Sequence, residues 1–293
     1  MPWLQLRINS SRDGAAAIED ALLSAGSVSV TLEDNADQPI FEPALGETPL
    51  WQATRITGLF DAETDTGAAE EHLVQILGKR PDGHWQLLED KDWEREWMQH
   101  YHPIQCGANF WICPSWLPAP DPDAVNLLLD PGLAFGTGTH PTTFLCLQWL
   151  AQQHLHQKTV IDYGCGSGIL GIAALLLGAK SAIGIDIDPQ ALLASRDNAG
   201  RNGLPADAFP VFLPGRASAA PVDLLVANIL AGPLVDLAPV ISEMVKLGGQ
   251  LCLSGILETQ AHTVMQAYES AFSFAPATQK DGWVCLMARK TSV

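Results

Sequence analysis

One short stretch of the chain places a carboxylate and three glycines where a ligand could approach the backbone. The sequence VIDYGCGSG spans residues 160–168, so an apolar run ends in Asp162 and glycines follow at every second position. Glycine has no Cβ to keep a ligand away, and it tolerates positive φ angles. In a parallel α/β sheet, ligands bind at such a turn, beyond the carboxyl end of a strand. We therefore take Asp162, Gly164 and Gly166 as candidate ligand-binding residues.

The position of Asp162 indicates which ligand this turn holds. The dinucleotide pattern G-x-G-x-x-G, counted from Gly164, would need a glycine at position 169, where Ile169 stands. A carboxylate two residues before the first glycine would also lie close to a pyrophosphate, and like charges repel. S-adenosylmethionine carries an ammonium and a sulfonium group and has no phosphate. The pattern therefore favours S-adenosylmethionine over NAD as the cofactor.

A second carboxylate supports a nucleoside ligand. Asp186 ends the next apolar stretch, 20 residues after Gly166, where a carboxylate can accept hydrogen bonds from both ribose hydroxyls. Asp188 follows and precedes Pro189, which predicts that Asp188 caps a helix. The other glycine-rich segment, GLAFGTGTHPTT at 132–143, lacks the lysine of a phosphate-binding loop.

Asn228, at the end of the apolar stretch VDLLVAN, is the candidate for positioning the methyl acceptor. Its carboxamide can accept a hydrogen bond from an incoming amine and orient the lone pair of the nitrogen. Ile229 and Leu230 follow it, in place of the N-P-P-Y sequence often found where glutamine or adenine is methylated. A planar amide or a nucleobase is therefore a disfavoured acceptor, and no dedicated general base stands out in the sequence.

The elements that position these residues alternate between strand and helix in the second part of the chain. Short apolar strand candidates begin at residue 125 and are separated by helical patterns at 142–154, 168–178, 189–201, 231–246 and 258–270. Alternation of this kind predicts an α/β fold, a doubly wound Rossmann-like domain over residues 125–293. The last two strand candidates, in 272–290, predict an antiparallel hairpin.

The first part of the chain predicts a smaller α+β domain over residues 1–90. Strand patterns at 3–9, 28–34, 53–61 and 84–90 and helix patterns at 14–25 and 67–78 give the β-α-β-β-α-β order of the ferredoxin-like motif. Residues 91–124 are interpreted as a linker, with a helix at 91–103 and a proline-rich loop. Trp93, Trp97 and Tyr101 recur with helical spacing in it and are expected to pack.

Net charge limits the class of partner. The chain carries a net charge of −17. Residues 1–100 contain 19 acidic and 7 basic side chains and so contribute most of this negative charge. A nucleic-acid backbone requires a basic face, so direct binding to nucleic acid is disfavoured, whereas a cationic partner would be attracted. The acidic surplus also has a simpler interpretation, since it keeps a cytosolic protein soluble.

The cysteines and the apolar runs favour a cytoplasmic protein. Six cysteines form no C-x-x-C pair, so we expect reduced, mostly buried thiols and no metal site. The longest apolar run, 169–179, is about half the ~20 residues of a membrane-spanning helix, and no secretory signal is seen. We expect no membrane association.

Four blocks of the sequence together resemble the family of ribosomal protein L-eleven methyltransferases. They are DPGLAFGTGTHPTT (130–143), VIDYGCGSGILGIAA (160–174), GIDIDPQAL (184–192) and ANILAGPL (227–234). The resemblance extends to PWLQL and DKDWEREWMQHYHPI, so it covers essentially the whole chain. The glycine block alone is shared by many class I methyltransferases, whereas FGTGTHPTT and NILAGPL are more specific.

The resemblance implies that S-adenosylmethionine donates methyl groups to lysine ε-amines and the N-terminal α-amine of a large-subunit ribosomal protein. It implies a monomer whose residues 1–90 dock the basic protein substrate. It assigns Thr143 to cofactor binding, although Thr143 or Thr142 could instead only cap the helix that follows. Phe135 is expected to cover the cofactor, and Asn228 to contact it. His140 is open to a structural or a chemical role.

Other functions remain open from the sequence alone. A methyltransferase of small molecules or RNA could use the same scaffold, although RNA would call for a basic face. An NAD-dependent oxidoreductase and a non-catalytic cofactor-binding module are the alternatives from other classes. Calorimetry with S-adenosylmethionine and with NAD would separate these.

Overall fold

The computed structural model describes residues 2–36, 49–88, 101–130, 138–217 and 220–292. Contacts within the chain divide it into two units, Met1–Met98 and Gln99–Val293. The predicted linker helix, with Trp93 and Trp97, lies almost wholly outside the described residues, as does Phe135. Among the described helices, none is long and apolar enough to cross a membrane.

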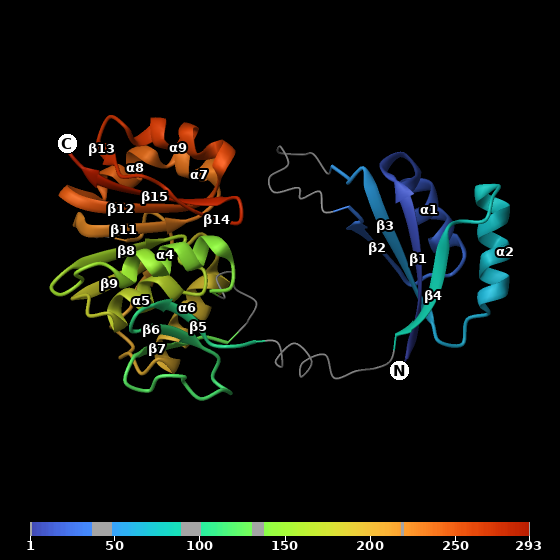
Figure 1. The fold of residues 1–293 in the computed structure, drawn as a ribbon, viewed down its shortest axis with the longest axis horizontal. Helices are drawn as coiled ribbons and strands as arrows, with labels where there is room; N and C mark the ends of the chain where they lie inside the picture. Colours follow the sequence, from blue (N-terminus) through green and yellow to red (C-terminus); the bar gives the residue numbers. More distant parts are fainter. Residues whose placement is uncertain (1, 37–48, 89–100, 131–137, 218–219, 293) are drawn as a thin grey trace. The chain divides into compact units, whose positions relative to one another are not determined.

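The first unit is a four-stranded antiparallel sheet with two helices (Figure 1). Its elements are β1 (Trp3–Ser11), α1 (Arg12–Ser24), β2 (Ser29–Asp34), β3 (Ala53–Asp61), α2 (Thr66–Leu77) and β4 (Gly83–Leu88). The strands lie in the order β2-β3-β1-β4. The predicted β-α-β-β-α-β order of elements is therefore present in the structure.

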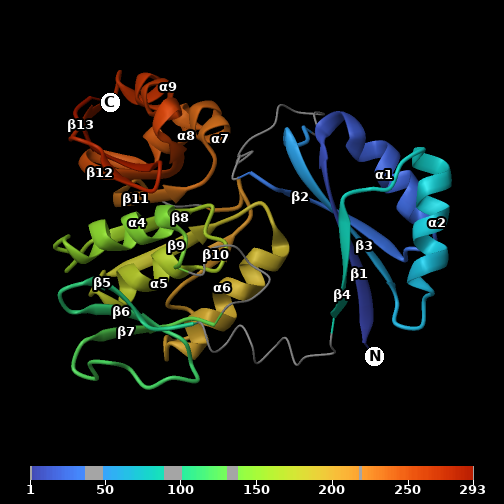
Figure 2. The same ribbon diagram turned by 45° about the vertical axis from the view of Figure 1, so that its right-hand side comes forward.

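Period-two alternation gives this sheet one apolar face. Leu6, Ile8, Ile56 and Phe60 are at most 2 % exposed, and they pack with α1 and α2, which lie together on that face (Figure 2). Asp65 caps α2, because its carboxylate accepts hydrogen bonds from the backbone N–H groups of residues 67 and 68. The burial of this face holds the unit together.

The second unit begins with a small sheet that the sequence did not predict. Its strands are β5 (Ile104–Gly107), β6 (Phe110–Cys113) and β7 (Val125–Leu128). β5 and β6 form an antiparallel hairpin inside the segment interpreted as linker, and β7 pairs parallel with β6 instead of joining the main sheet. These strands are only four residues long, too short for a clear alternation of burial.

The main sheet of the second unit has the predicted alternating strands and helices. Its elements in order are β8 (Thr159–Tyr163), β9 (Ser181–Ile185), β10 (Val211–Phe212), β11 (Val222–Asn228), β12 (Val245–Leu257), β13 (Phe272–Phe274), β14 (Thr278–Lys280) and β15 (Trp283–Lys290), with helices α4 (Pro141–Ala151), α5 (Ile169–Leu176), α6 (Pro189–Arg201), α7 (Ala231–Asp236), α8 (Ala238–Glu243) and α9 (Ala261–Tyr268). The strand order is β10-β9-β8-β11-β12-β15-β13. Strands β8 to β12 are parallel, and β13 and β14 each pair antiparallel with β15, as the predicted hairpin requires.

Helices cover both faces of this sheet, which confirms the doubly wound fold. Val160 and Leu224 belong to the core beneath α4, α5 and α6, whereas Ile161 and Leu225 belong to the core beneath α7, α8 and α9. The helix expected at 231–246 is instead two helices. Pro239 has no N–H to donate to the carbonyl four residues earlier, and the backbone breaks at Leu237.

Candidate functional site

The loop after β8 adopts a conformation that favours glycine. Gly164, Gly166 and Gly168 have φ angles of 74°, 52° and 79°. A Cβ on Gly164 would lie 2.2 Å from the side chain of Ile229. The backbone N–H groups of Gly164 and Cys165 donate to the carbonyl of Ile185, so the loop is fastened to the end of β9.

This loop forms one wall of a cavity of about 710 Å³ at the carboxyl ends of the parallel strands. The cavity lies where the chain order of the sheet reverses, between β8 and β11, which is the expected ligand position in such a fold. Its volume is within the range of small-molecule sites. Thr143, Gly164, Gly166, Asp186 and Asn228 all line it, so five of the seven predicted site residues share one cavity.

Asp186 stands at the end of β9 and braces the glycine loop. Its Oδ2 accepts a hydrogen bond from the Gly166 N–H at 2.8 Å, and its Oδ1 accepts one from the Asp188 N–H at 2.9 Å. Each carboxylate oxygen keeps a further lone pair that can accept a hydroxyl hydrogen bond. Asp188 caps α6 through the Gln190 N–H, as the sequence predicted.

Asp162 is placed differently from its predicted role. It is 1 % exposed and does not line the cavity; its Oδ2 accepts the Gly171 N–H of α5 at 2.8 Å. Side chains alternate along β8, so Asp162 shares the α5 face with Val160, while Tyr163 lines the cavity. Asp162 therefore fastens the helix that follows the loop, and its contact with the cofactor stays a prediction.

Burial changes the acidity of this carboxyl group. Desolvation raises the pKa of Asp162 from its usual value near 3.8 to about 7, and the nearby carboxylate of Asp186 raises it too, against the hydrogen bond from Gly171. Its Oδ1 is buried and has no hydrogen-bond donor among the described residues. Asp162 therefore holds a proton more readily than an exposed aspartate.

Asn228 ends β11 with its carboxamide at the cavity. Its Nδ2 donates to the Oγ1 of Thr143 at 3.1 Å, and its Oδ1 is buried with no donor among the described residues. Thr143 is fully buried in the first turn of α4. A buried amide oxygen without a partner is unfavourable unless a ligand supplies the donor. The cavity thus presents a hydrogen-bond acceptor to whatever enters it.

The start of α4 adds His140 to the cavity wall. His140, and neither Thr142 nor Thr143, is the N-cap residue of α4; its Nδ1 accepts the Thr142 N–H at 3.4 Å. Desolvation lowers the pKa of His140, so the neutral imidazole is favoured. The expected cap was Thr142 or Thr143, since threonine is a common cap residue.

Trp283 is a cavity residue that the sequence analysis missed. It begins β15 and meets His140 edge to face, with ring centroids 5.0 Å apart. Its place depends on the antiparallel pairing of β15 with β12, which sets Trp283 opposite Leu257. No local signal marks this residue, because a tryptophan at the start of a strand is ordinary in a core.

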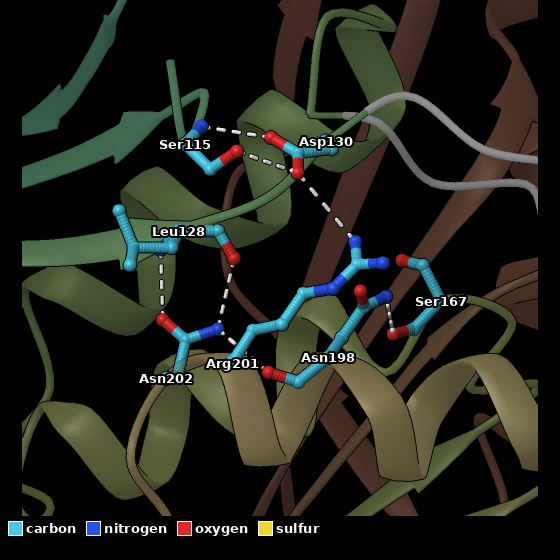
Figure 3. Close-up of polar contacts among 7 residues, drawn as sticks. All are labelled: Ser115, Leu128, Asp130, Ser167, Asn198, Arg201 and Asn202. Atoms are coloured by element: carbon cyan, nitrogen blue, oxygen red, sulfur yellow. Dashed lines mark hydrogen bonds and ion pairs between the residues drawn. The ribbon is translucent and has the colours of Figure 1, made fainter. Parts of the chain in front are cut away.

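Two asparagines, Asn198 in α6 and Asn202 at its C-cap, fasten the glycine loop to the rest of the unit (Figure 3). The Nδ2 of Asn198 donates to the carbonyl of Ser167 in the glycine loop at 2.8 Å. One turn later, Asn202 accepts the backbone N–H of Leu128 at 2.7 Å and donates to the carbonyl of the same residue at 2.8 Å. α6 therefore connects the glycine loop to the end of β7.

These features fit an adenosine-containing sulfonium better than a dinucleotide. The site has a bare glycine turn and a carboxylate at the end of the second strand, and its cavity holds a buried acceptor without a donor among the described residues. The fold and this site define a class I S-adenosylmethionine-dependent methyltransferase. The sequence model of the family described as Ribosomal protein L11 methyltransferase (PrmA) matches residues 2–291, and the chain belongs to this family.

Relatives extend over the full length of the chain. A protein named Ribosomal protein L11 methyltransferase from Saccharophagus degradans is 64 % identical over 99 % of this chain and 100 % of its own length. One of the same name from Teredinibacter turnerae is 62 % identical over 100 % of this chain and 98 % of its own length. The crystal structure of a ribosomal protein L11 methylase from Lactobacillus delbrueckii is 34 % identical, covers 65 % of this chain and 100 % of its own, and superposes with a TM-score of 0.57.

Proposed function

We propose that the protein transfers methyl groups from S-adenosylmethionine to ribosomal protein L11, at lysine ε-amines and at the N-terminal α-amine. The relatives carry this substrate in their names. The single observation that supports an amine acceptor is the buried Asn228 Oδ1, which lines the cavity without a donor among the described residues.

Asn228 acts by position in this proposal. The cofactor supplies an electrophilic methyl carbon, and the acceptor nitrogen must present its lone pair to that carbon in line. The Asn228 Oδ1 accepts an N–H of the amine, which leaves the lone pair free to point at the methyl carbon. Thr143 fixes the rotation of the carboxamide, because it accepts the hydrogen bond from Nδ2 and so leaves Oδ1 as the atom presented to the amine.

The amine must be neutral when it reacts. A lysine with an ordinary pKa of about 10.4 loses its proton to water as it leaves bulk solvent. His140 and Trp283 add an aromatic edge to the cavity, along which the aliphatic part of a lysine side chain can pack. Desolvation favours the neutral amine over the ammonium and so assists the reaction.

The first unit recruits the substrate in this proposal. Residues 1–100 hold most of the net negative charge, and such a field attracts a basic ribosomal protein. Residues 1–90 are accordingly the docking domain, and 91–124 connect it to the methyltransferase domain. The protein works as a cytoplasmic monomer, bound directly neither to nucleic acid nor to a membrane.

A methylation assay with purified L11 and labelled S-adenosylmethionine tests the proposal. Asn228→Ala should lower kcat by about tenfold or more, which corresponds to ~1.4 kcal/mol or more of lost transition-state stabilisation. Cofactor affinity, measured by calorimetry, should change much less. Undiminished kcat in this variant would remove the role of Asn228.

Mass spectrometry of L11 before and after the reaction tests the target. We expect methyl groups on lysines and on the N-terminal residue. Methylation confined to other residue types would contradict the amine assignment, and no transfer to L11 at all would contradict the substrate.

A further inference from the structure

Three cysteine thiols meet in the core of the second unit. Cys146 lies on α4, Cys252 on β12 and Cys285 on β15, and each of them is 0 % exposed. The Sγ of Cys252 is 3.3 Å from that of Cys285 and 3.9 Å from that of Cys146, and the three sulfurs all lie within 4.8 Å of one another. We call these three residues the thiol cluster.

The pairing of β12 with β15 brings the thiols together. Cys252 of β12 lies opposite Met287 of β15, so the two side chains face the same side of the sheet. Cys285 lies two residues before Met287 on β15 and therefore faces that side too. α4 packs across that side and adds Cys146. The residues are too far apart in sequence for a spacing motif, which explains why the sequence analysis expected no metal site.

The distances fit a three-coordinate centre. An ion bound by thiolates lies about 2.3 Å from each sulfur. Three sulfurs at that distance around a planar centre would lie about 4 Å apart, and they would lie closer around a pyramidal one. The separations of 3.3 and 3.9 Å in the thiol cluster are close to these values without a ligand.

Charge selects among ions that prefer sulfur. Three thiolates around a monovalent ion would leave two negative charges in the core, and a divalent ion would leave one. Only a trivalent ion gives a neutral complex, and uncompensated buried charge is strongly unfavourable.

We propose that the thiol cluster is a binding site for trivalent arsenic. Arsenous acid, As(OH)3, exchanges its three hydroxyl groups for the sulfurs of Cys146, Cys252 and Cys285. Three As–O and three S–H bonds break, three As–S bonds form, and the three thiol protons leave with the hydroxyl groups as three water molecules. Arsenic remains trivalent throughout, so no oxidant or reductant takes part.

Occupation of this site affects the methyltransferase cavity. Thr143 lies three residues before Cys146 on α4, Trp283 lies two before Cys285 on β15, and Gly255 follows Cys252 by three on β12. All three line the cavity. An arsenic atom added among three side chains that already pack in the core displaces the segments that carry these residues, so arsenic binding inhibits methyl transfer.

Mass spectrometry of the intact, natively folded full chain incubated with arsenite tests the site directly. We expect one adduct per chain, with the mass of one arsenic atom less three hydrogen atoms. The loss of three hydrogens distinguishes a three-thiol complex from binding by one or two cysteines. No adduct on the folded wild-type chain, or an adduct that retains a hydroxyl group, would overturn the proposal.

Single substitutions locate the site. Cys146→Ala, Cys252→Ala and Cys285→Ala should each weaken arsenite binding by more than about tenfold, equivalent to ~1.4 kcal/mol. Cys106→Ala, which removes a buried thiol outside the thiol cluster, is the matched control and should bind as the wild type does. Wild-type affinity in any variant of the thiol cluster that folds, as judged by S-adenosylmethionine binding, would overturn the assignment. The wild-type mass measurement decides the question if none of these variants folds.

Inhibition has its own readout. S-adenosylmethionine binding, measured by calorimetry with and without one equivalent of arsenite, should weaken in the wild type and in Cys106→Ala. This measurement needs no protein substrate, so its result does not depend on L11 being the acceptor. Unchanged cofactor binding in the arsenic-loaded chain would overturn the coupling to the cavity.

Discussion

The carboxamide of Asn228 donates to the hydroxyl of Thr143 at 3.1 Å, across 85 positions of sequence. This hydrogen bond connects the end of β11 to the first turn of α4, and it decides which atom of the carboxamide remains without a donor. Thr143 was assigned to the cofactor by resemblance. The geometry supports a second role, in which Thr143 orients the residue that receives the amine.

Replacement of Thr143 by valine removes this acceptor while keeping the shape of the side chain. We expect kcat to fall by about three- to tenfold, since a hydrogen bond contributes roughly 1 kcal/mol. Steady-state kinetics with L11 provide the measurement. Thr143→Ser retains the hydroxyl and should recover most of the rate; equal losses in both variants would show that packing, and not the hydrogen bond, matters.

Asp186→Ala should weaken S-adenosylmethionine binding by about 10- to 100-fold, because hydrogen bonds to a charged group contribute about 1.5–3 kcal/mol. Isothermal titration calorimetry measures this directly. Asp188→Ala removes only the cap of α6 and is the matched control. It should cost about 1 kcal/mol of stability and leave the cofactor affinity nearly unchanged. Equal affinity in the two variants would contradict the role of Asp186.

Asn198 in α6 and Asn202 at its C-cap make a paired test of the glycine loop (Figure 3). Asn198→Ala removes the donor to the Ser167 carbonyl, so we expect KM for S-adenosylmethionine to rise by roughly five- to tenfold with little change in kcat. Asn202→Ala, one turn away, should lower the melting temperature without that change in KM. A rise in KM that is the same in both variants would mean that α6 acts only through stability.

Asp162 predicts a dependence of stability on pH. The folded chain keeps the Asp162 proton up to about pH 7, whereas an unfolded aspartic acid loses it near pH 4. The folded state therefore binds more protons between these values, and the contribution of Asp162 to stability falls as pH rises through this window. Asp162→Asn has no such proton to lose.

The melting temperature of Asp162→Asn relative to wild type should accordingly rise by several degrees between about pH 5 and pH 8. Differential scanning calorimetry at both values checks this. Asp207→Asn, at an exposed carboxylate, is the control and should follow the wild type. If the melting temperatures of Asp162→Asn and wild type change in parallel with pH, the pKa of Asp162 in the folded chain is not raised.

Separation of the two units gives a further prediction. A fragment of residues 99–293 contains the whole cavity and should bind S-adenosylmethionine with an affinity within about threefold of the full chain, which corresponds to less than ~1 kcal/mol. It should methylate L11 far more slowly, because the docking unit is missing. Full activity in the fragment would refute the docking role of the first unit.

Local patterns were enough to predict most of the fold and five of the residues that line the cavity. Apolar stretches separated by helical periods predicted the doubly wound sheet. Because the ends of parallel strands meet at one edge of a sheet, the same pattern also predicted that Asp186 and Asn228 lie at one site. The cap at Asp188 also followed from local sequence, since an aspartate before a proline is a strong signal.

Features that depend on tertiary packing could not be predicted in the same way. Asp162 points from β8 toward α5. Both faces of a buried parallel strand are apolar, so the sequence pattern does not indicate which of its side chains face the ligand. Trp283 and the thiol cluster depend on the register between β12 and β15. The hairpin of β5 and β6 is too short to show a period.

The reversal of strand order between β8 and β11 divides the cavity wall along the gene. Gly164, Gly166 and Asp186, the residues proposed to bind the donor, come before the crossover to β11, whereas Asn228 and Trp283, proposed for the acceptor, come after it. Exchange of segments between family members could therefore alter the choice of methyl acceptor while donor recognition is inherited intact.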